Sequence, residues 1–255
     1  MFQGKELLDL SDSAMNEIRG SGIAMIFQQP QMALNPVMRV CDHFIEVLNL
    51  HAGLSNKEAR LSGIELLEKV GIPGAKRIMR AYPHELSGGM AQRIMISLAL
   101  AVDPVLLIAD EPTTALDVTI QAQILDLLRE VCARIDTAII LITHDLGVVA
   151  EIAQRVAVMY AGRIMEEAEV EKLYEQPLHP YTQGLMGSVP VLGKPKKDLD
   201  VIPGSVPNLI SLPNGCRFAP RCRARIEQNL QICLEEEPLL QLVDDRHKVR
   251  CWLHH

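Results

Sequence analysis

The sequence predicts an α/β fold built around a mostly parallel sheet. Three apolar runs, within residues 21–29, 105–109 and 138–143, have the length of buried strands and are separated by segments with helical periodicity. The runs are continuously apolar rather than alternating, which is typical of parallel strands with both faces covered. Hydrophobic residues make up 48% and charged residues 22% of the 255 positions, which allows a sizeable core.

Local signals mark the first strand and the helices that follow it. After the strand within 21–29, residues 30–54 combine loop with a helix near Asp42–Leu50. Ser55 and Glu58 form an S-x-x-E capping box, which predicts the start of a helix. Its apolar positions at helical spacing, up to Gly71, are Leu61, Ile64, Leu67 and Val70. A further helix is predicted over Met90–Val102.

The second half of the core repeats this alternation. "VLLIADEP" follows Asp103-Pro104 as a strand, and Val118–Ile135 is predicted as a helix. "AIILITHD" is the next strand, and a helix is expected from about Leu146 to Ala153. "RVAVMYAGRIME" then predicts a hairpin that turns at Gly162.

Composition changes near Pro177, where we place a domain boundary between residues 1–176 and 177–255. Nine of the 15 prolines and four of the six cysteines lie from that point to the end. The second region is therefore predicted to be a small, loop-rich appendage. The other two cysteines, Cys41 and Cys132, fall within helical patterns and are expected in the core.

Charge and hydropathy narrow the class of protein. The net charge of −7 argues against a general nucleic-acid binder. The start, "MFQGKELLDL", lacks the pattern of a signal peptide, and no apolar run approaches the roughly 20 residues that span a bilayer. These features predict a cytoplasmic protein, in which cysteines are thiols or metal ligands rather than disulfides.

Two acids, Asp110 and Glu111, lie at the end of the strand that begins "LLIA", where an open α/β sheet binds its ligands. Asp110 has the hard oxygen ligands that suit hydrated Mg²⁺, and Glu111 is placed to deprotonate an attacking water. The alternative interpretation is an acidic turn after a core strand.

Other polar residues at strand and helix ends have two interpretations each. Gln28 ends the first apolar run, and its amide suits both a metal ion and a water; otherwise it is a polar strand end. His144 follows the third run and either reaches a terminal phosphate or makes a local hydrogen bond. Asp117 is either a ligand-contacting acid or the N-cap of the next helix.

"LSGGMAQR" places Ser87, Gly88 and Gly89 at the start of the predicted helix. Exposed N–H groups at a helix N-terminus bind phosphates, and glycine lets the backbone come close to them. The Lys that accompanies a phosphate-binding P-loop does not follow.

The order Gln28, Ser87-Gly88-Gly89, Asp110-Glu111, Asp117 and His144 resembles the ATPase subunits of ABC transporters. In that comparison Gln28 matches the Q-loop, "LSGGM" the signature, "LLIADE" the Walker B strand, "ALD" the D-loop and His144 the switch histidine. Longer stretches, including "AYPHELSGGMAQRIMISLAL" and "PLHPYTQGLMGSVP", resemble the oligopeptide, dipeptide and nickel importer branch.

The resemblance implies a P-loop-NTPase-like ABC ATPase core with a helical subdomain over about 33–82. It implies ATP with Mg²⁺ as ligand, and Glu111, His144 and Gln28 as catalytic residues. It also implies a second ATPase subunit, identical or homologous, whose bound γ-phosphate contacts the signature loop. Two membrane permease subunits and, indirectly, an extracytoplasmic substrate-binding protein complete the implied assembly at the cytoplasmic face of the membrane.

The P-loop itself is not among these residues. Gly4-Lys5 precedes Glu6 and Gly193-Lys194 precedes Pro195, so neither pair fits G-x-x-x-x-G-K followed by Ser or Thr. Two hypotheses follow: a truncated ATPase that hydrolyses ATP in its complete form, or a non-catalytic partner that lends its signature loop to a complete sister subunit.

Cys216, Cys222, Cys233 and Cys251 are spaced C-x5-C-x10-C-x17-C, unlike the paired C-x2-C of a zinc ribbon. The resembled branch associates such a tail with a 4Fe–4S cluster, whose negative charge the four nearby arginines (217, 221, 223 and 225) would balance. Zinc, with His247 in place of one Cys, and buried thiols without metal are the two alternatives.

Overall fold

The computed structural model describes residues 1–114, 116–188 and 202–255, which form two compact units, Met1–His144 and Asp145–His255. Ala115 of the predicted D-loop and the Gly193-Lys194 pair lie outside the described residues.

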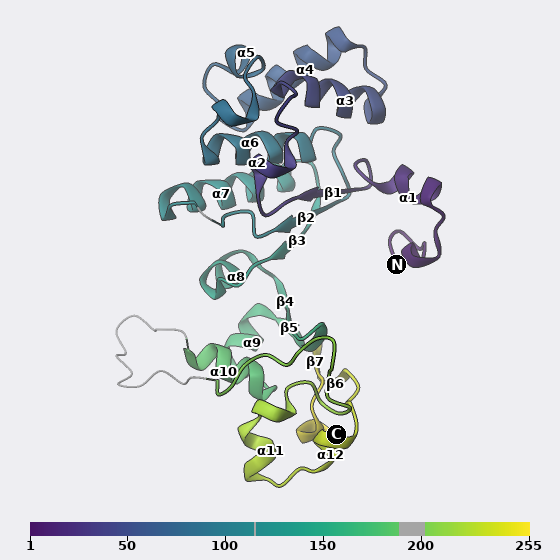
Figure 1. Cartoon of the computed structure of the whole chain (residues 1–255), viewed down its shortest axis with the longest axis vertical. Helices are drawn as coiled ribbons and strands as arrows, with labels where there is room; N and C mark the ends of the chain where they lie inside the picture. Colours follow the sequence, from purple (N-terminus) through teal and green to yellow (C-terminus); the bar gives the residue numbers. More distant parts are fainter. Residues whose placement is uncertain (115, 189–201) are drawn as a thin grey trace. The chain divides into compact units, whose positions relative to one another are not determined.

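The first unit contains a parallel sheet of three strands. These are β1 (Ile23–Ile26), β2 (Leu106–Asp110) and β3 (Ala138–Ile142), in the order β1-β2-β3. The register pairs Ile23 with Leu106 and Leu106 with Ala138, so the three strands run side by side from the same starting level. The predicted strands within 105–109 and 138–143 are thus present and adjacent, which confirms the α/β fold class (Figure 1).

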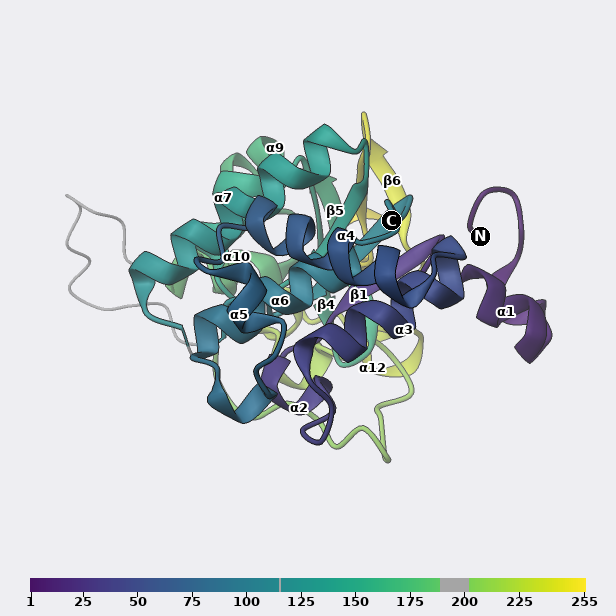
Figure 2. The ribbon, with the colours of Figure 1, turned by 90° about the horizontal axis from the view of Figure 1, so that it is seen from above.

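Seven α-helices and two short 3-10 turns are described in the first unit. They are η1 (Leu7–Asp9), α1 (Asp12–Ile18), α2 (Pro30–Ala33), α3 (Val40–Ala52), α4 (Asn56–Lys69), α5 (Ala75–Ile78), η2 (Pro83–Glu85), α6 (Gly88–Ala99) and α7 (Val118–Arg134). Figure 1 shows α3, α4 and α5 gathered in a helical lobe on one side of α6, with the strands on its other side. Helix α6 contacts α3, α4 and β1, and in the view from above it runs beneath the lobe (Figure 2).

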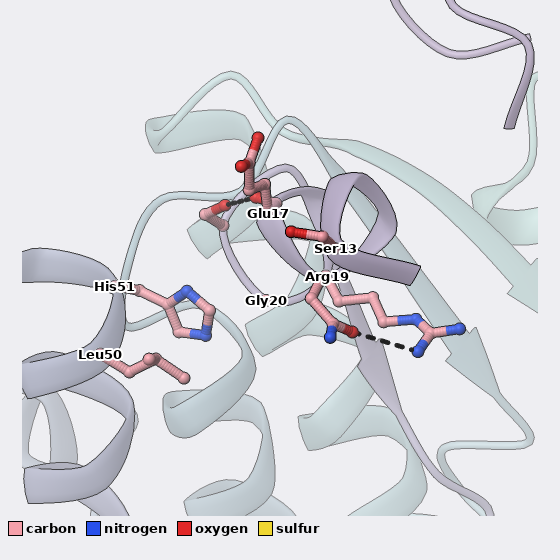
Figure 3. Close-up of a pocket in the computed structure, with 8 residues that line it drawn as sticks. Ser13, Glu17, Arg19, Gly20, Leu50 and His51 are labelled. Carbon is pink, nitrogen blue, oxygen red and sulfur yellow. Dashed lines mark hydrogen bonds between the residues drawn. The ribbon is translucent and has the colours of Figure 1, made fainter. Parts of the chain in front are cut away.

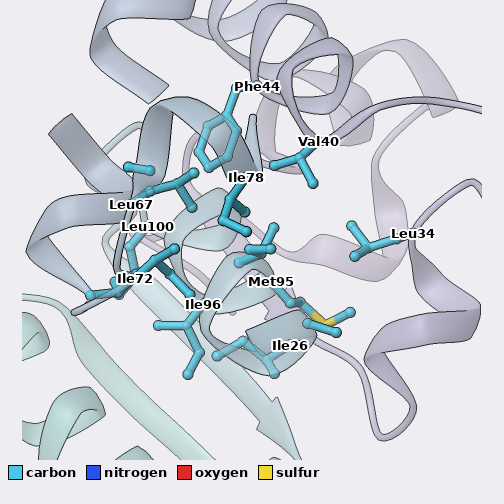
Figure 4. Packing of buried hydrophobic residues seen from close by; sticks show 14 of the residues in the cluster. Ile26, Leu34, Val40, Phe44, Leu67, Ile72, Ile78, Met95, Ile96 and Leu100 are labelled. Atoms are coloured by element: carbon cyan, nitrogen blue, oxygen red, sulfur yellow. The ribbon is translucent and has the colours of Figure 1, made fainter. Parts of the chain in front are cut away.

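One hydrophobic core joins the lobe to the sheet. Phe44 of α3, Leu67 of α4 and Ile96 of α6 are fully buried in the same cluster as Ile26 of β1 (Figure 4). Gly63 allows this approach, because a Cβ there would meet the side chain of Phe44 at 2.9 Å. The position of the lobe is therefore fixed by packing against α6 rather than by a flexible connection.

The capping box at the start of α4 forms as predicted. The backbone N–H of Ser55 donates to Oε2 of Glu58 at 2.9 Å, and the backbone N–H of Glu58 donates to Oγ of Ser55 at 3.4 Å. The spacing of the apolar residues predicts that both Leu61 and Leu67 of α4 are buried. Leu67 is buried, whereas Leu61 is 55% exposed, so the buried face of α4 is narrower than predicted.

Helix α6 also differs from its predicted range. It begins at Gly88, two residues before Met90, because the hydroxyl of Ser87 caps it, and it ends at Ala99. The helices predicted near Asp42–Leu50 and over Val118–Ile135 are present as α3 and α7, with ends shifted by one or two residues.

Strand β3 departs from the expected burial on both faces. Ile139 and Leu141 pack against the core, whereas Ile140 and Ile142 on the opposite face are 49% and 47% exposed. Within the described part of the first unit, β3 pairs with β2 alone. β3 is thus an edge strand of this sheet, and the face that carries Ile140 and Ile142 is only partly covered.

The second unit contains an antiparallel sheet, so the parallel sheet ends with β3. Its strands are β4 (Arg155–Tyr160), β5 (Arg163–Glu169), β7 (His247–Val249) and β6 (Gln241–Asp244), in that order across the sheet. The β4–β5 hairpin turns at Gly162, as predicted, where φ is +78°. The helical elements are α8 (Leu146–Ile152), α9 (Val170–Glu175), α10 (Pro180–Ser188), η3 (Ala219–Arg221), α11 (Arg223–Glu227), α12 (Ile232–Glu235) and η4 (Trp252–His254).

Strand β7, from the region rich in cysteine, pairs with β5 of the hairpin. This pairing places residues from both sides of Pro177 in one sheet. The boundary between residues 1–176 and 177–255, and the helical subdomain over about 33–82, stay predictions about domain organisation.

Two leucines of α4 test the packing of the lobe. We expect Leu67→Ala to lower the free energy of unfolding by about 2–5 kcal/mol, because it leaves a cavity in the core. Leu61→Ala, on the same helix but exposed, is the matched control and should change stability by no more than about 0.5 kcal/mol. Urea unfolding followed by circular dichroism measures both, and equal losses would contradict the packing described.

Candidate functional site

Three strand ends meet at the carboxyl edge of the parallel sheet. Gln28 lies two residues beyond β1, Glu111 directly follows β2, and His144 lies two residues beyond β3. Because the strands are parallel and in register, their carboxyl ends share one edge, where α/β sheets bind ligands.

The carboxylate of Glu111 is the centre of this edge. Nε2 of Gln28 donates to Oε2 of Glu111 at 2.6 Å, and Nδ1 of His144 lies 2.9 Å from Oε1. The hydroxyl of Thr114 also donates to Oε2, at 2.8 Å. The structure thus brings together the three residues that the sequence predicts as catalytic, and it adds Thr114.

Thr114 was missed because its residue type alone carries no sign of the contact. The only signal in the sequence is its position, three residues after Glu111 in "EPTT". A turn that begins at Glu111 brings Thr114 back beside it, since the backbone N–H of Thr114 donates to the carbonyl of Glu111 at 3.1 Å.

The backbone of Glu111 has an uncommon conformation. Its φ is +43°, in the left-handed region that a non-glycine residue adopts at a cost of roughly 1–2 kcal/mol. Its N–H donates to the carbonyl of Ile142 at 2.9 Å, so the last residue of β3 holds it in place. The strain is thus offset by pairing across the sheet, and the carboxylate points to a fixed position.

Hydrogen bonds keep this carboxylate ionised. The pKa of Glu111 is held below its usual value, first by the hydrogen bond from His144 and then by the one from Thr114. An ionised carboxylate only accepts, so Nδ1 of His144 donates and Nε2 is the ring nitrogen left for another partner. The side chain of His144 is 79% exposed and that of Glu111 is 23% exposed.

Asp110 ends β2 and is partly buried beside this network. Among the described residues, no group of three or more His, Cys, Asp and Glu side chains is arranged to hold a metal ion. Mg²⁺ commonly binds through one carboxylate together with substrate phosphates and water. Asp110 and Gln28 as Mg²⁺ ligands therefore stay a prediction.

The loop of Ser87, Gly88 and Gly89 begins α6. Oγ of Ser87 accepts from the backbone N–H of Met90 at 3.3 Å. A Cβ on Gly89 would lie 3.2 Å from Ile120, whereas one on Gly88 would meet only Leu116, at 3.7 Å. Packing within the chain therefore does not require a glycine at position 88, which is exposed.

Asp117 caps the next helix. Its Oδ1 accepts from the backbone N–H of Ile120 at 3.0 Å at the start of α7. This is the structural role that the sequence offered as the alternative, and the contact with a nucleotide stays a prediction.

In the second unit, the thiols of Cys216, Cys222, Cys233 and Cys251 are all buried. Cys216, Cys222 and Cys233 belong to one hydrophobic cluster, and the backbone N–H of Cys216 donates to the carbonyl of Cys233 at 2.8 Å. Burial raises the pKa of Cys216 to about 11 and that of Cys251 to about 12, so without a bound metal these thiols are protonated. Cys41 and Cys132 are buried in the first unit, as predicted.

Figure 3 shows a pocket of the first unit. It has a volume of about 790 Å³, is wide open to solvent, and includes Glu17, Arg19, Gly20 and His51. A Cβ on Gly20 would lie 2.5 Å from Nε2 of His51, so glycine is required for this close approach. None of the residues that line this pocket belongs to the predicted site.

Within the described ranges, no helix combines the length and apolar character that a membrane crossing needs.

Two family descriptions match the chain. "ABC transporter" matches residues 1–114, and "Oligopeptide/dipeptide transporter, C-terminal region" matches residues 165–228. The oligopeptide transport ATP-binding protein AppD of Bacillus subtilis is 49% identical over 99% of this chain and 76% of its own length. The dipeptide transport ATP-binding protein DppD of the same organism is 50% identical over 99% of this chain and 74% of its own length.

Solved structures of similar fold include two ATP-binding cassettes. The dimeric, post-hydrolysis state of MJ0796 bound to ADP and Pi has a TM-score of 0.59 and 27% identity, over 66% of this chain and 72% of that one. CbiO1 of Clostridium perfringens, part of the ABC transporter complex cbiONQ, has a TM-score of 0.59 and 28% identity over 69% and 67%.

The network around Glu111 predicts a graded series of pKa changes. Each donor stabilises the charged carboxylate, so its removal should raise the pKa of Glu111, most in His144→Ala, less in Thr114→Val and least in Gln28→Ala. Carbon-13 titration of glutamate carboxylates by NMR measures the pKa. Glu58, whose pKa is lowered by Ser55, serves as an internal control and should not change. A larger rise in Gln28→Ala than in His144→Ala would contradict this order of contributions.

Proposed function

The chain belongs to the ABC transporter ATP-binding proteins of the oligopeptide and dipeptide type, and on that premise we propose that Glu111 is the base of its ATP hydrolysis. The chain is the ATP-hydrolysing subunit of a peptide importer. The observation that carries the role of Glu111 is the convergence of Gln28, His144 and Glu111 from three strand ends.

The geometry supports one role for each side chain. Glu111, ionised and fixed in position, accepts the proton of the water that attacks the γ-phosphate. Nδ1 of His144 donates to Glu111, and the exposed Nε2 of His144 could hydrogen-bond the γ-phosphate as its bond to ADP breaks. The amide of Gln28 orients the water or the metal ion. Asp110 would hold Mg²⁺, which when bound neutralises phosphate charge.

The signature loop supports a second subunit. The exposed face of Gly88 and the cap formed by Ser87 offer backbone N–H groups at the N-terminus of α6 to a phosphate from outside the chain. We propose a second ABC ATPase subunit, identical or homologous, as the source of that phosphate. Two permease subunits and an extracytoplasmic binding protein complete the proposed importer, with this chain peripheral at the cytoplasmic face of the membrane.

A second candidate function is favoured by the exposed signature loop. As a non-catalytic partner, the chain would contribute Ser87, Gly88 and Gly89 to the active site of a complete sister subunit and perform no hydrolysis with its own Glu111.

Two substitutions in the assembled ATPase pair distinguish these functions. We expect Glu111→Gln to lower ATP turnover at least ~100-fold, because the amide cannot accept the proton. The exposed Glu130→Gln on α7 is the matched control and should leave turnover unchanged. Ser87→Arg, which blocks the signature loop, should lower turnover under both hypotheses.

Phosphate release at saturating ATP measures turnover in each variant. Full activity of Glu111→Gln together with loss in Ser87→Arg would reject the catalytic role of Glu111 and support the non-catalytic partner. Full activity in both variants would reject both functions.

We further propose that the four thiols of the second unit hold a 4Fe–4S cluster. Cys216, Cys222 and Cys233 lie in one buried cluster, and the backbone N–H of Arg225 donates to Sγ of Cys222 at 3.4 Å. Among the described residues the four thiols are not arranged as a preformed metal site, so cluster binding would bring them together. The zinc alternative would need His247, whose Nε2 lies 2.7 Å from Oε1 of Glu166. When bound, the cluster would cross-link the segments that carry these cysteines.

Metal analysis of anaerobically purified protein tests this assignment. We expect about four iron and four sulfide per chain, a brown colour, and loss of both in Cys222→Ser. Cys132→Ser, which removes a buried thiol of α7, is the matched control and should retain the cluster. Stoichiometric zinc, or protein without metal, would contradict the proposal.

A further inference from the structure

The helical lobe contains a small pocket that no part of the proposed ATPase mechanism uses. It has a volume of about 250 Å³ and lies between the start of α3, helix α4 and helix α5. Four cationic side chains line it, namely Arg39, Arg60, Lys76 and Arg80, and Ile64 and Met79 contribute apolar surface.

Three of these cations have no carboxylate partner. Among the described residues, no ion pair involves Arg60, Lys76 or Arg80. Arg39 contacts an aromatic residue instead, with its guanidinium 5.5 Å from the ring centre of Tyr82. The pocket therefore gathers positive charge in a chain whose net charge is −7.

The carboxylate of Asp42, beside Arg39, forms its hydrogen bonds at the start of α3. Oδ2 of Asp42 accepts from the backbone N–H of Arg39 at 3.1 Å, and the thiol of Cys41 donates to its Oδ1 at 3.3 Å. The carboxylate is thus occupied by the start of α3. The side chains of Arg60, Lys76 and Arg80 remain available to an anion from outside the chain.

We propose that this pocket binds a phosphate group. Its four cations are exposed and come from three separate segments, so they could approach a compact anion from more than one side. Guanidinium groups form paired, charge-assisted hydrogen bonds with phosphate oxygens. A volume of about 250 Å³ holds one phosphate with a short organic substituent, and it is below the 300–1,000 Å³ that is usual for larger ligands.

The shape of the site favours phosphate over an acidic peptide. A carboxylate presents two oxygens in one plane, and an extended peptide needs a long groove rather than a small pocket between three segments. The phosphate has two sources with the same chemistry: a free phosphate ester or inorganic phosphate, and the head group of an anionic lipid. The pocket shares no residue with the site at Glu111, so the proposal does not rest on the ATPase mechanism.

NMR of the full chain with labelled methionine methyl groups tests the site with inorganic phosphate. We expect a saturable shift of the Met79 signal in the millimolar range of phosphate, because this side chain lines the pocket. The double variant Arg60→Gln/Arg80→Gln should weaken phosphate binding at least ~10-fold, since it removes two charge-assisted contacts.

The matched control removes the same charge from the same lobe. Lys69→Gln/Arg77→Gln changes exposed cations of α4 and α5 that do not line the pocket, and it should change phosphate affinity by less than about twofold. An equal loss in both double variants would reduce the binding to general surface charge and overturn the proposal.

Vesicle sedimentation distinguishes the source of the phosphate. Vesicles of phosphatidylcholine alone are compared with vesicles that also contain phosphatidic acid, which exposes a phosphate monoester. Binding that depends on phosphatidic acid and is lost in Arg60→Gln/Arg80→Gln alone would identify a lipid head group, whereas a shift with inorganic phosphate alone would identify a free ligand. Failure of both, or a Met79 shift with hexaglutamate but not with phosphate, would reject the site.

Discussion

The carboxylate of Glu111 depends on the register of three parallel strands. Gln28, Thr114 and His144 reach it from β1, from the turn after β2 and from β3, and the carbonyl of Ile142 holds its strained backbone. A slip of one residue in either strand pair would turn these side chains to the opposite face of the sheet. The geometry of the site is therefore a consequence of the pairing of Ile23 with Leu106 and of Leu106 with Ala138.

Helix α6 links that edge to the signature loop and to the lobe. Its N-terminus presents Ser87 and Gly88, while Ile94 and Ile96 are fully buried in the core that includes Ile26 of β1. The backbone N–H of Phe27, next to Gln28, donates to the sulfur of Met95 at 3.3 Å. The same helix therefore fixes the segment that carries Gln28 and the loop that begins with Ser87.

The sequence was sufficient to predict local structure where a short pattern is typical of one conformation. The capping box at Ser55, the apolar run of β2 and the carboxyl-edge residues Glu111 and His144 all follow from local spacing and from the parallel order of the strands. It was insufficient where burial depends on distant segments. The exposed face of Ile140 in β3 and the exposure of Leu61 in α4 depend on which neighbours cover them, and helical or strand periodicity does not encode those neighbours.

The contact of Thr114 and the basic pocket were missed for a related reason. Arg39, Arg60, Lys76 and Arg80 are spread over 42 residues and share no motif, so only the packing of α3, α4 and α5 brings them together. Cys216, Cys222, Cys233 and Cys251 differ from these cations, because cysteine is rare enough for its residue type alone to suggest a common site. The sequence therefore predicts chemistry when the residue type is rare and misses it when the residue type is common on surfaces.

The two anion-directed sites of the first unit have opposite charge, which bears on how ATP is held. Asp110, Glu111, Gln28 and His144 supply two carboxylates and no Lys or Arg, so this edge by itself would repel a phosphate. In the proposed mechanism, positive charge must therefore come from Mg²⁺ and from a phosphate cradle before Glu111 could direct a water to the γ-phosphate. The lobe pocket has the reverse composition, with cations and no carboxylate in its lining. It is therefore suited to retain an anion and not to activate water, and the two sites perform separate tasks within one unit.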